Sequence, residues 1–573
     1  MSVELNRYIL NLNNLKHYIL LKIIYFAIYI SITKEKNNNL INFSSEIHLL
    51  INGSGTQNLL NNSFYPKPSE VFINSINNND SCNISYEHEY EIKNVTLIFN
   101  ETLNSTAIMF YGLDNIIEID LSLFDFSYVT TMENMFRNCS NLKKINFGNI
   151  NTSSVTNMKW LFHNCSKLIS IDVSNFDTSF VTTMEGMFYN CTNLLTINVS
   201  NFNTSNIETL RTFLYNCTKL IYIDVSNFDT SKITNMEGMF YNNSNLLSID
   251  VSNFNTSKVE SFIYMFYNCK KLTSINVSNF DTSLVTNFER MFYECSGLLS
   301  IDVTNFNTSK ATSIRSIFYN CNKFTSLNIS NFDTSSFTDM QFLFFNLTNI
   351  KSIDISNFNT QNIKSLHSFF SRCQNLISID ISFFDTSKVT DFDYIFYDCI
   401  KLKSINLLNF DTSSAKDMTC LFYNCYNLEY LDLTNFDTSS VTFMGGMFYS
   451  CYSLKKIKFP EIFNTSQVVS MKSMFLECKS LISLNLSSFD VSKVTDMSYM
   501  FYNCHNLKYL DIPNFSPINL KVITQMFYNM SSLIFLNINS LEIISKATTT
   551  KSFDLLPPDL KICSNRTNML SYY

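Results

Sequence analysis

A repeat of 26 residues runs through most of this 573-residue chain and constrains the fold more than any other feature. Each copy contains a pair such as Met-Phe, whose second residue is Phe or Leu. From Phe110 to Phe448 this second residue recurs every 26 residues. The next step, to Phe475, is 27 residues long, with the extra residue near Pro460, and two further steps of 26 reach Phe527. We count 17 copies. Such a period predicts a solenoid, because one short unit cannot bury its apolar face without stacking on its neighbours.

Each copy combines two spacings of apolar residues, as the stretch from Leu168 to Cys191 shows. Ile171 and Val173 alternate with a polar residue, which predicts a short strand. An Asp-Thr-Ser turn at Asp177 follows. The second half has apolar residues at intervals of 3, 3 and 1, at Val181, Met184, Met187 and Phe188. This spacing is typical of one face of a short helix. We therefore predict an α/β solenoid of about 17 coils, with a parallel sheet on one face and short helices on the other.

Composition supports one continuous core and argues against several classes of function. Gly (9) and Pro (7) are scarce, whereas Phe (53) and Tyr (30) are abundant, so core-forming residues are plentiful. The net charge of −7 and the absence of a basic stripe argue against nucleic-acid binding. The repeats contain no Gly-rich phosphate loop, no H-E-x-x-H motif, no nucleophile elbow and no Cys-x-x-Cys pair. We expect neither an enzyme nor a cofactor.

The repeat sequence resembles that of a known family. Asn227 to Asn242 reads N-F-D-T-S-K-I-T-N-M-E-G-M-F-Y-N, and other copies continue with C-x-x-L-x-x-I-D-V-S. This pattern is similar to the repeat of BspA-like leucine-rich-repeat surface proteins over about three quarters of the chain. The resemblance implies a leucine-rich-repeat solenoid on a microbial or protist surface, in a family associated with adhesion and with host or matrix binding. It names no ligand.

The regions outside the repeats have other compositions. Residues 18–32 are apolar except for Lys22, which favours an export signal, with an uncleaved anchor or a buried segment as alternatives. Glu91 to Asn100 predicts a capping strand over the first coil, and Pro557-Pro558 marks the end of regular structure. We divide the chain into residues 1–36, a signal peptide or anchor; 37–104, an N-terminal non-repeat region and cap; 105–540, the solenoid; and 541–573, a C-terminal tail or cap.

Thirteen of the 16 cysteines occupy one column, in which Asn243, Leu347 and Met530 also occur. Side chains in a parallel stack lie about 4.8 Å apart, too far for a disulfide. We predict reduced thiols buried as small hydrophobic groups. Cys82 and Cys563, near opposite ends of the array, are expected to bridge only locally or between chains.

Acidic and amide residues alternate in two further columns. The strand column includes Asp172 and Asn198, and the turn column includes Asp177 and Asn203. Alternation relieves repulsion between stacked carboxylates and lets each amide donate to its neighbours, which predicts a ladder between coils. Calcium binding is the alternative, because oxygen-rich columns offer its preferred ligands. We favour the ladder and predict no metal site.

Two more columns have a structural and a functional interpretation. A Tyr column, with Tyr189 and Tyr215, predicts stacked rings, although tyrosines also bind carbohydrate. A Thr column, with Thr178 and Thr204, predicts capping of the turn, although a regular Thr surface is also compatible with ice binding.

The repeat departs from uniformity near its C-terminal end, where we predict a binding patch. Most copies present Ser, Asp or Asn, and Ser on the exposed strand face, but later copies carry aromatic and basic residues there. The predicted patch consists of Tyr430, Lys455, Lys456, Lys458, Lys508 and Tyr509. Aromatic rings beside positive charge favour an anionic partner. Sequence drift in terminal repeats is the alternative explanation.

We expect a non-catalytic surface or secreted binding protein, extracellular or at the cell surface, that adheres to host, matrix or neighbouring-cell ligands. An intracellular leucine-rich-repeat scaffold for protein interactions is the alternative. The expected ligand is a protein or a glycan, not nucleic acid. Membrane contact is expected only through the N-terminal segment, if that segment is not cleaved.

Overall fold

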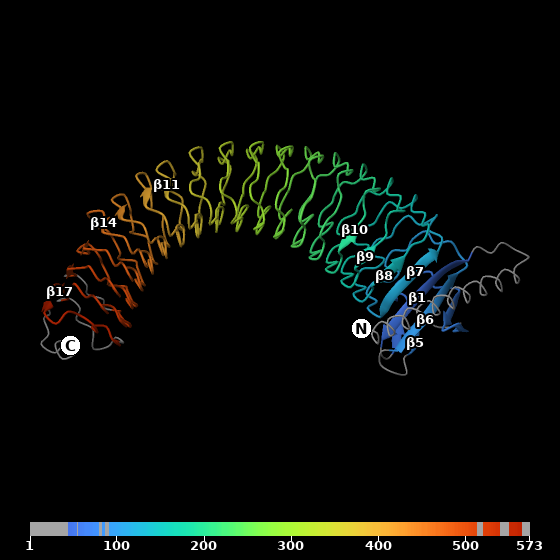
Figure 1. Ribbon diagram of the computed structural model, residues 1–573, viewed down its shortest axis with the longest axis horizontal. Coiled ribbons are helices and arrows are strands. Elements are labelled where there is room, and N and C mark those ends of the chain that lie inside the picture. The colour runs from blue at the N-terminus through green and yellow to red at the C-terminus, as the bar shows by residue number, and fades with distance from the viewer. Residues whose placement is uncertain are drawn as a thin grey trace, which may run out of the picture.

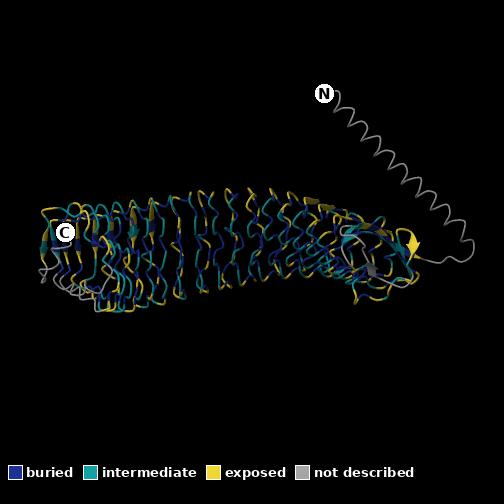
Figure 2. Cartoon of the chain, turned by 90° about the horizontal axis from the view of Figure 1, so that it is seen from below, coloured by how far each residue is buried: buried dark blue, intermediate teal, exposed yellow. Residues whose placement is uncertain are grey.

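The computed structural model shows an arched solenoid whose coils follow one another along a single axis (Figure 1). It describes residues 44–53, 56–78, 83–85, 91–512, 519–538 and 549–563. The predicted signal or anchor segment and Cys82 lie outside these residues. Buried residues recur in every coil along the arch (Figure 2), as expected for one continuous core. The described residues include no helix that is long and apolar enough to cross a membrane.

A mixed sheet closes the N-terminal end of the solenoid. Its strands, in the spatial order β4-β3-β6-β1-β7-β8, are β1 (Ser45–Gly53), β3 (Glu70–Ile73), β4 (Ile76–Asn77), β6 (Glu91–Phe99), β7 (Ile116–Leu123) and β8 (Lys144–Asn146). All neighbours are antiparallel except β7 and β8, which begin the parallel stack. A separate antiparallel pair joins β2 (Thr56–Asn58) to β5 (Asn83–Ser85).

The strand predicted at 91–100 exists as β6, but it does not cover the first coil. β1 lies between β6 and β7 and pairs with both. The reason is visible in β1 itself, where Ile47, Leu49 and Ile51 alternate with less buried residues and face the core. The sequence analysis predicted that 91–100 covers the first coil, but β1 does so. The alternation in β1 was missed because it lies in the Asn-rich region, to which we had assigned no strand.

The solenoid strands are short and parallel, as predicted. They are β9 (Ser170–Ile171), β10 (Thr196–Ile197), β11 (Ser378–Asp380), β12 (Ser404–Asn406), β13 (Tyr430–Asp432), β14 (Lys456–Lys458), β15 (Ser483–Asn485), β16 (Tyr509–Asp511), β17 (Phe535–Asn537) and β18 (Lys561–Cys563). Each paired residue faces its equivalent in the next coil, as Ser378 faces Ser404. Between β10 and β11, single backbone bonds continue the contact, such as Ile221 N to Leu195 O at 3.2 Å. We call this side of the solenoid the strand side.

The helices predicted for the opposite side are wrong, since the described residues contain no helix. This turn side is a chain of β-turns, in which Met187 N bonds to Met184 O at 3.1 Å and Cys191 N bonds to Phe188 O at 3.3 Å. Gly186 and Asn190 take the left-handed conformation and donate to the next coil instead. Both a helix and a series of β-turns place apolar residues about three positions apart on one face. The buried face was therefore predicted correctly, although the backbone conformation was not. Met184, Met187 and Phe188 are fully buried.

The left-handed position of Asn190 carries an amide ladder between coils. Asn164 donates through Nδ2 to Oδ1 of Asn138 at 3.2 Å, and the same bond joins each later member to the one before it. This asparagine ladder comprises Asn138, Asn164, Asn190, Asn216, Asn242 and Asn268. Asparagine tolerates the left-handed conformation better than most residues. The amide ladder that was predicted for the Asp/Asn columns therefore occurs here, on the turn side.

The Asp/Asn strand column stabilises its own turn. Oδ1 of Asp172 accepts from Ser174 N at 3.0 Å and from Ser174 Oγ at 2.6 Å, and these bonds hold the pKa of Asp172 below its usual value. Asn198 accepts the same pair of bonds from Ser200. The predicted ladder between coils is therefore wrong for Asp172 and Asn198, because both side chains bond to the serine two residues later. It does occur at the C-terminal end of the same column, where Asn537 Nδ2 donates to Asp511 Oδ1 at 2.8 Å.

The Thr column is buried and joins neighbouring coils. The Thr178 side chain is 1% exposed, accepts a bond from Asn203 N at 2.7 Å and donates to Asn203 O at 3.0 Å. Thr152 makes the same two bonds with Asp177. The prediction that these threonines cap their own turn is wrong. Asp177 does that instead, because its Oδ1 accepts from Ser179 N at 3.0 Å.

The Cys column is buried, as predicted, and its thiols also donate hydrogen bonds. Sγ of Cys139 donates to Phe110 O at 3.0 Å, and burial raises the pKa of this thiol to about 12. Asn243 occupies the column with an Nδ2 bond to Leu214 O at 2.9 Å. A cysteine thiol and an asparagine amide thus both donate a hydrogen bond from this column. The column therefore accepts hydrogen-bond donors as well as the inert side chains of Leu347 and Met530.

The stack continues past the predicted boundary at residue 540. β18 pairs in parallel with β17, and the ring of Phe553 stacks on that of Phe527 at 5.5 Å. Ser552, at the position equivalent to Met526, donates to Ile523 O at 2.5 Å. The Pro557-Pro558 pair precedes β18 instead of ending the regular structure. Cys563 is exposed at the end of β18.

Candidate functional site

The predicted patch divides into two parts on the strand side. β13 and β14 are neighbours, so Tyr430 faces Lys456 and Asp432 faces Lys458. Tyr509 lies on β16, whose neighbours are β15 and β17, and Lys508 precedes it. The structure therefore brings Tyr430, Lys456 and Lys458 together, whereas Lys508 and Tyr509 form a second pair farther along the stack.

Ion pairs reduce the positive charge of this patch. Lys455 Nζ lies 2.8 Å from Glu429, and Lys458 Nζ lies 3.3 Å from Asp432. The Tyr430 hydroxyl donates to Asp432 Oδ2 at 3.2 Å. These partners are more than two-fifths exposed, so solvent screens each pair and its contribution to stability is small. The patch remains aromatic and polar, but it is less basic than predicted.

The sequence analysis missed an exposed apolar stripe on the strand side. Ile169, Leu195, Ile221 and Leu247 are 39–52% exposed. Backbone bonds of 3.0 to 3.2 Å from each of the last three residues to its predecessor place the four side by side on successive coils. The signal was present as an apolar pair before each strand, of which the first residue, such as Leu168, is buried and the second is exposed. We call these four residues the apolar stripe.

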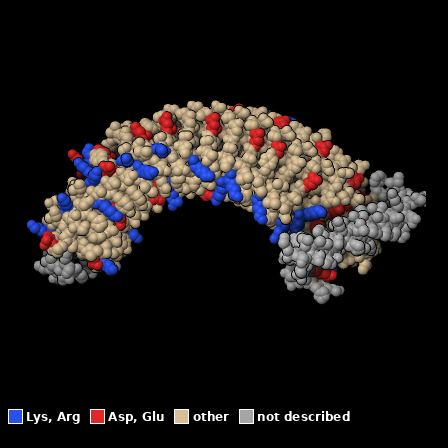
Figure 3. Space-filling model, in the orientation of Figure 1, with Lys and Arg blue, Asp and Glu red and all other residues tan. Residues whose placement is uncertain are grey.

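The column of the apolar stripe changes character along the solenoid. Later coils place charged residues at the equivalent position, interspersed with exposed aliphatic ones: Leu299, Lys351, Ile377, Lys403, Glu429, Lys455, Ile482, Lys508 and Ile534. The column is thus continuously apolar over the four coils of the apolar stripe and mixes charged with apolar residues toward the C-terminal end. Charge is also unevenly distributed over the face seen in Figure 3, where Lys and Arg gather along the inner edge of the arch and Asp and Glu along the outer edge.

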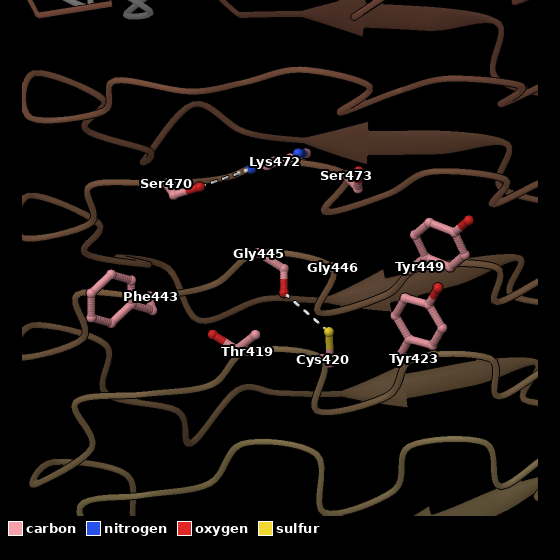
Figure 4. Close-up of a pocket in the computed structure, with 10 residues that line it drawn as sticks. All are labelled: Thr419, Cys420, Tyr423, Phe443, Gly445, Gly446, Tyr449, Ser470, Lys472 and Ser473. Atoms are coloured by element: carbon pink, nitrogen blue, oxygen red, sulfur yellow. Dashed lines mark hydrogen bonds between the residues drawn. The ribbon is translucent and has the colours of Figure 1, made fainter. Parts of the chain in front are cut away.

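The turn side carries a hollow of about 460 Å³ near its C-terminal third (Figure 4). Gly445 and Gly446 form its floor, the stacked rings of Tyr423 and Tyr449 lie along one side, and Lys472 lies on the next coil. The two tyrosine rings are 4.1 Å apart, as predicted for the Tyr column. A flat group such as an aromatic or sugar ring fits a surface of this kind.

The hollow forms where two adjacent residues, Gly445 and Gly446, lack side chains. A Cβ added to Gly186, the equivalent of Gly446 in an earlier coil, would lie 2.5 Å from Trp160, so an indole fills that space. At Gly446 the residue of the preceding coil is Cys420, whose Sγ would lie 3.0 Å from an added Cβ, so a much smaller side chain occupies the equivalent space. Sequence reasoning missed the site, although a Gly-Gly pair is conspicuous in a chain with nine glycines.

A second group of side chains lies on the turn side, in the coils before the hollow. Nδ1 of His367 is hydrogen-bonded to Asp393, and Asp391 lies beside them. Burial and the neighbouring Asp393 raise the pKa of Asp391 to about 6. Burial alone would lower the pKa of His367, but the hydrogen bond and charge of Asp393 raise it. The sequence analysis missed this group because its members come from different coils.

The repeats of the solenoid match a known protein family. A family described as "Mycoplasma protein of unknown function, DUF285" matches residues 104–221, 210–326, 298–378, 364–460 and 455–555. The chain belongs to this family. Its five matches cover the solenoid from the first coil to the last described turn. No match was found among curated proteins.

Several solved structures show a partial likeness. The TLR13–ssRNA13 complex is 17% identical over 74% of this chain, with a TM-score of 0.21, and the match spans 58% of the TLR13 chain. A leucine-rich-repeat protein of Leptospira interrogans is 13% identical over 68% of this chain and 95% of its own, with a TM-score of 0.20. CroV588, a circular leucine-rich-repeat protein, is 11% identical over 78% of each chain, with a TM-score of 0.14. Scores this low carry no argument, so the description of the fold rests on the coils themselves.

Proposed function

We propose that this protein is a non-catalytic binding protein, secreted or held at the cell surface, whose strand side attaches to a protein on host cells, matrix or neighbouring cells. The observation that carries the proposal is the apolar stripe. Four exposed aliphatic side chains on successive coils span about 15 Å at strand spacing. Contiguous exposed apolar surface marks interaction sites more often than scattered apolar residues do. The resemblance of the repeats to BspA-like surface proteins supports the surface location.

The chemistry of the strand side specifies the partner. The apolar stripe requires apolar side chains opposite Ile169 to Leu247, and the lysines from Lys351 to Lys508 favour acidic groups farther along. A protein surface offers this combination over the length of several coils. Tyr430 and Tyr509, which are 46% and 55% exposed, add aromatic contact area to the charged region.

The first experiment tests location. Intact cells that produce the protein are treated with protease, and the solenoid is then detected with an antibody. Loss of the signal from intact cells is the expected result. Protection in intact cells, with digestion in lysates, would instead support the intracellular scaffold and contradict the surface assignment.

The second experiment tests the strand side. The purified full-length protein is applied to host-cell monolayers and matrix-coated plates, and bound protein is measured at several salt concentrations. Leu195→Ser with Ile221→Ser removes two side chains that are 39% and 44% exposed, so each change costs about 0.6–1.3 kcal/mol of binding free energy and attachment weakens roughly 10-fold. Phe180→Ser is the matched control, because Phe180 is 63% exposed outside the stripe. Equal attachment by the stripe variant would refute this site.

The predicted patch is tested in the same assay by a variant with Tyr430→Ser, Lys456→Ser, Lys458→Asn and Tyr509→Ser. If the charged region contacts acidic groups of the partner, this variant attaches more weakly at low salt and loses part of its salt dependence. A variant with unchanged attachment and unchanged salt dependence would exclude the patch while leaving the apolar stripe untouched.

A further inference from the structure

A charge ladder on the turn side gives acidic residues a basic neighbour in the first half of the solenoid. Lys159 lies 2.6 Å from Glu185, which lies 3.4 Å from Arg211, which in turn lies 3.3 Å from Glu237. These four residues occupy equivalent positions on successive coils. The alternation of sign places each carboxylate between or beside cations.

The column of this charge ladder is interrupted at Ile263 and later carries His367 and Asp393, with Asp391 beside them. Parallel β-bridges join Asp391 to Ser365 of the preceding coil and to Asp417 of the next coil. Asp391 and Asp393, which belong to one coil, therefore have a third aspartate beside them on the next coil. Among the residues that the structure describes, no Lys or Arg forms an ion pair with Asp391, Asp393 or Asp417. His367 is the basic group that faces them. The His367–Asp393 pair accounts for one carboxylate, whereas Asp391 accepts hydrogen bonds from Asp393 N at 3.2 Å and from Ser365 and forms no ion pair among the described residues.

Neighbouring groups orient these side chains. The Ser365 hydroxyl donates to Asp391 Oδ2 at 3.0 Å, and His367 N donates to the same hydroxyl at 3.1 Å. His367 also packs its ring against that of Phe342, with centroids 4.6 Å apart. Arg315, whose charge acts on His367 from the other side, is paired with Asp339 at 3.4 Å. The imidazole and the Asp391 carboxylate are therefore held in place before any ligand arrives.

The three side chains are close enough to share an ion. One ligand atom from each of His367, Asp391 and Asp393 lies within 4.8 Å of the other two. A tetrahedral zinc ion with ligands at about 2.0–2.1 Å holds its ligand atoms about 3.4 Å apart, so rotation of half-buried side chains closes the remaining gap. An imidazole nitrogen with two carboxylates suits zinc and similar ions better than calcium or magnesium, which prefer oxygen ligands alone.

We propose that His367, Asp391 and Asp393 bind one divalent transition-metal ion of the zinc class across two neighbouring coils. The ion adds positive charge beside Asp391, Asp393 and Asp417, for which His367 is the basic neighbour. It also ties the coil of His367 to the coil of Asp391, so binding stabilises the solenoid where the two coils meet. Partial exposure of all three ligands leaves a coordination position for water.

The test is zinc titration of the purified full-length protein, free of any polyhistidine tag, followed by calorimetry. One zinc ion per chain is expected, with affinity at least 10-fold weaker in His367→Gln and in Asp391→Asn. His505→Gln is the matched control, because His505 lies on the same array, where its Nδ1 faces Ser531 at 3.4 Å, and it should bind zinc like the wild type.

Melting in the presence of a chelator keeps the test decisive if His367→Gln fails to fold. Asp391→Asn removes one of several neighbouring negative charges, so without metal it should melt no lower than the wild type. Zinc should raise the melting temperature of the wild type and leave that of Asp391→Asn unchanged. No stoichiometric zinc binding by the wild type, equal affinity in both ligand variants, or tighter binding of calcium than of zinc would overturn the proposal.

Discussion

The buried Thr column gives the sharpest test of how the coils adhere to one another. Thr178→Val keeps the shape of the side chain but removes the hydroxyl that bonds to both Asn203 N and Asn203 O. Since Thr178 is 1% exposed, water does not replace these bonds. Two buried polar groups without partners cost about 1–3 kcal/mol each, and a gained methyl group offsets about 0.8 kcal/mol. The expected loss of unfolding free energy is about 2–4 kcal/mol.

The assay is guanidinium unfolding followed by circular dichroism, with hydrogen exchange at the Asn203 amide as a local probe. In a repeat array, weakening one interface between coils lowers the protection of the residues on both sides of it. Thr182→Val is the matched control, because the Thr182 hydroxyl is exposed and bonds to Thr156 O at 3.2 Å. Its expected cost is below about 0.5 kcal/mol. If Thr178→Val proved as stable as the wild type, hydrophobic packing alone would hold these coils together and our reasoning would be refuted.

Three further predictions concern the core and the acidic columns. Phe280 is 2% exposed, and its ring lies 5.3 Å from that of Phe262. Phe280→Ala should therefore lower the free energy of unfolding by about 3–5 kcal/mol in a thermal melt, and a loss below about 1 kcal/mol would contradict the core assignment. Hydrogen bonds hold the pKa of Asp177 below its usual value, so the stability that this carboxylate contributes is complete above about pH 4 and is lost as the pH falls through the lowered pKa. Melting temperatures measured from pH 7 to pH 2 should show this loss, and a flat profile would contradict it. Asn198→Asp should change the melting temperature little at neutral pH, because the new carboxylate still accepts from Ser200, whereas a large loss relieved by salt would restore the ladder between coils.

The sequence predicted the architecture well because the period is a property of whole coils. Equivalent residues had to stack, so the inward positions of Ile171, Val173 and Phe188 followed from alternation and burial alone. The backbone of the turn side could not be predicted in the same way. A spacing of three fits a helix and also a chain of β-turns, and the left-handed residues that decide between them, Gly186 and Asn190, are only partly marked by residue type. Other coils place Trp160 or Arg290 at the same conformation as Gly186.

The candidate sites were predicted less well, because they depend on which neighbours a residue meets. The patch around Tyr430 was found as a departure from the consensus, but its ion pair between Lys458 and Asp432 needed the register of β13 and β14. The apolar stripe was missed because Leu195 follows a consensus leucine and both appeared to belong to the core. The hollow at Gly446 required the size of the side chain that faces it from the preceding coil.

The bonds that join the coils run along the axis of the arch, on the strand side, in the Thr column and in the asparagine ladder. A pulling force applied to the two ends would therefore load the interfaces in series, and the weakest interface would yield first. When one 26-residue coil unfolds, the molecule lengthens by about 80–90 Å. This is the length of the extended segment minus the spacing of one strand. Under tension such a molecule would extend in steps of nearly equal length while the remaining coils stay folded.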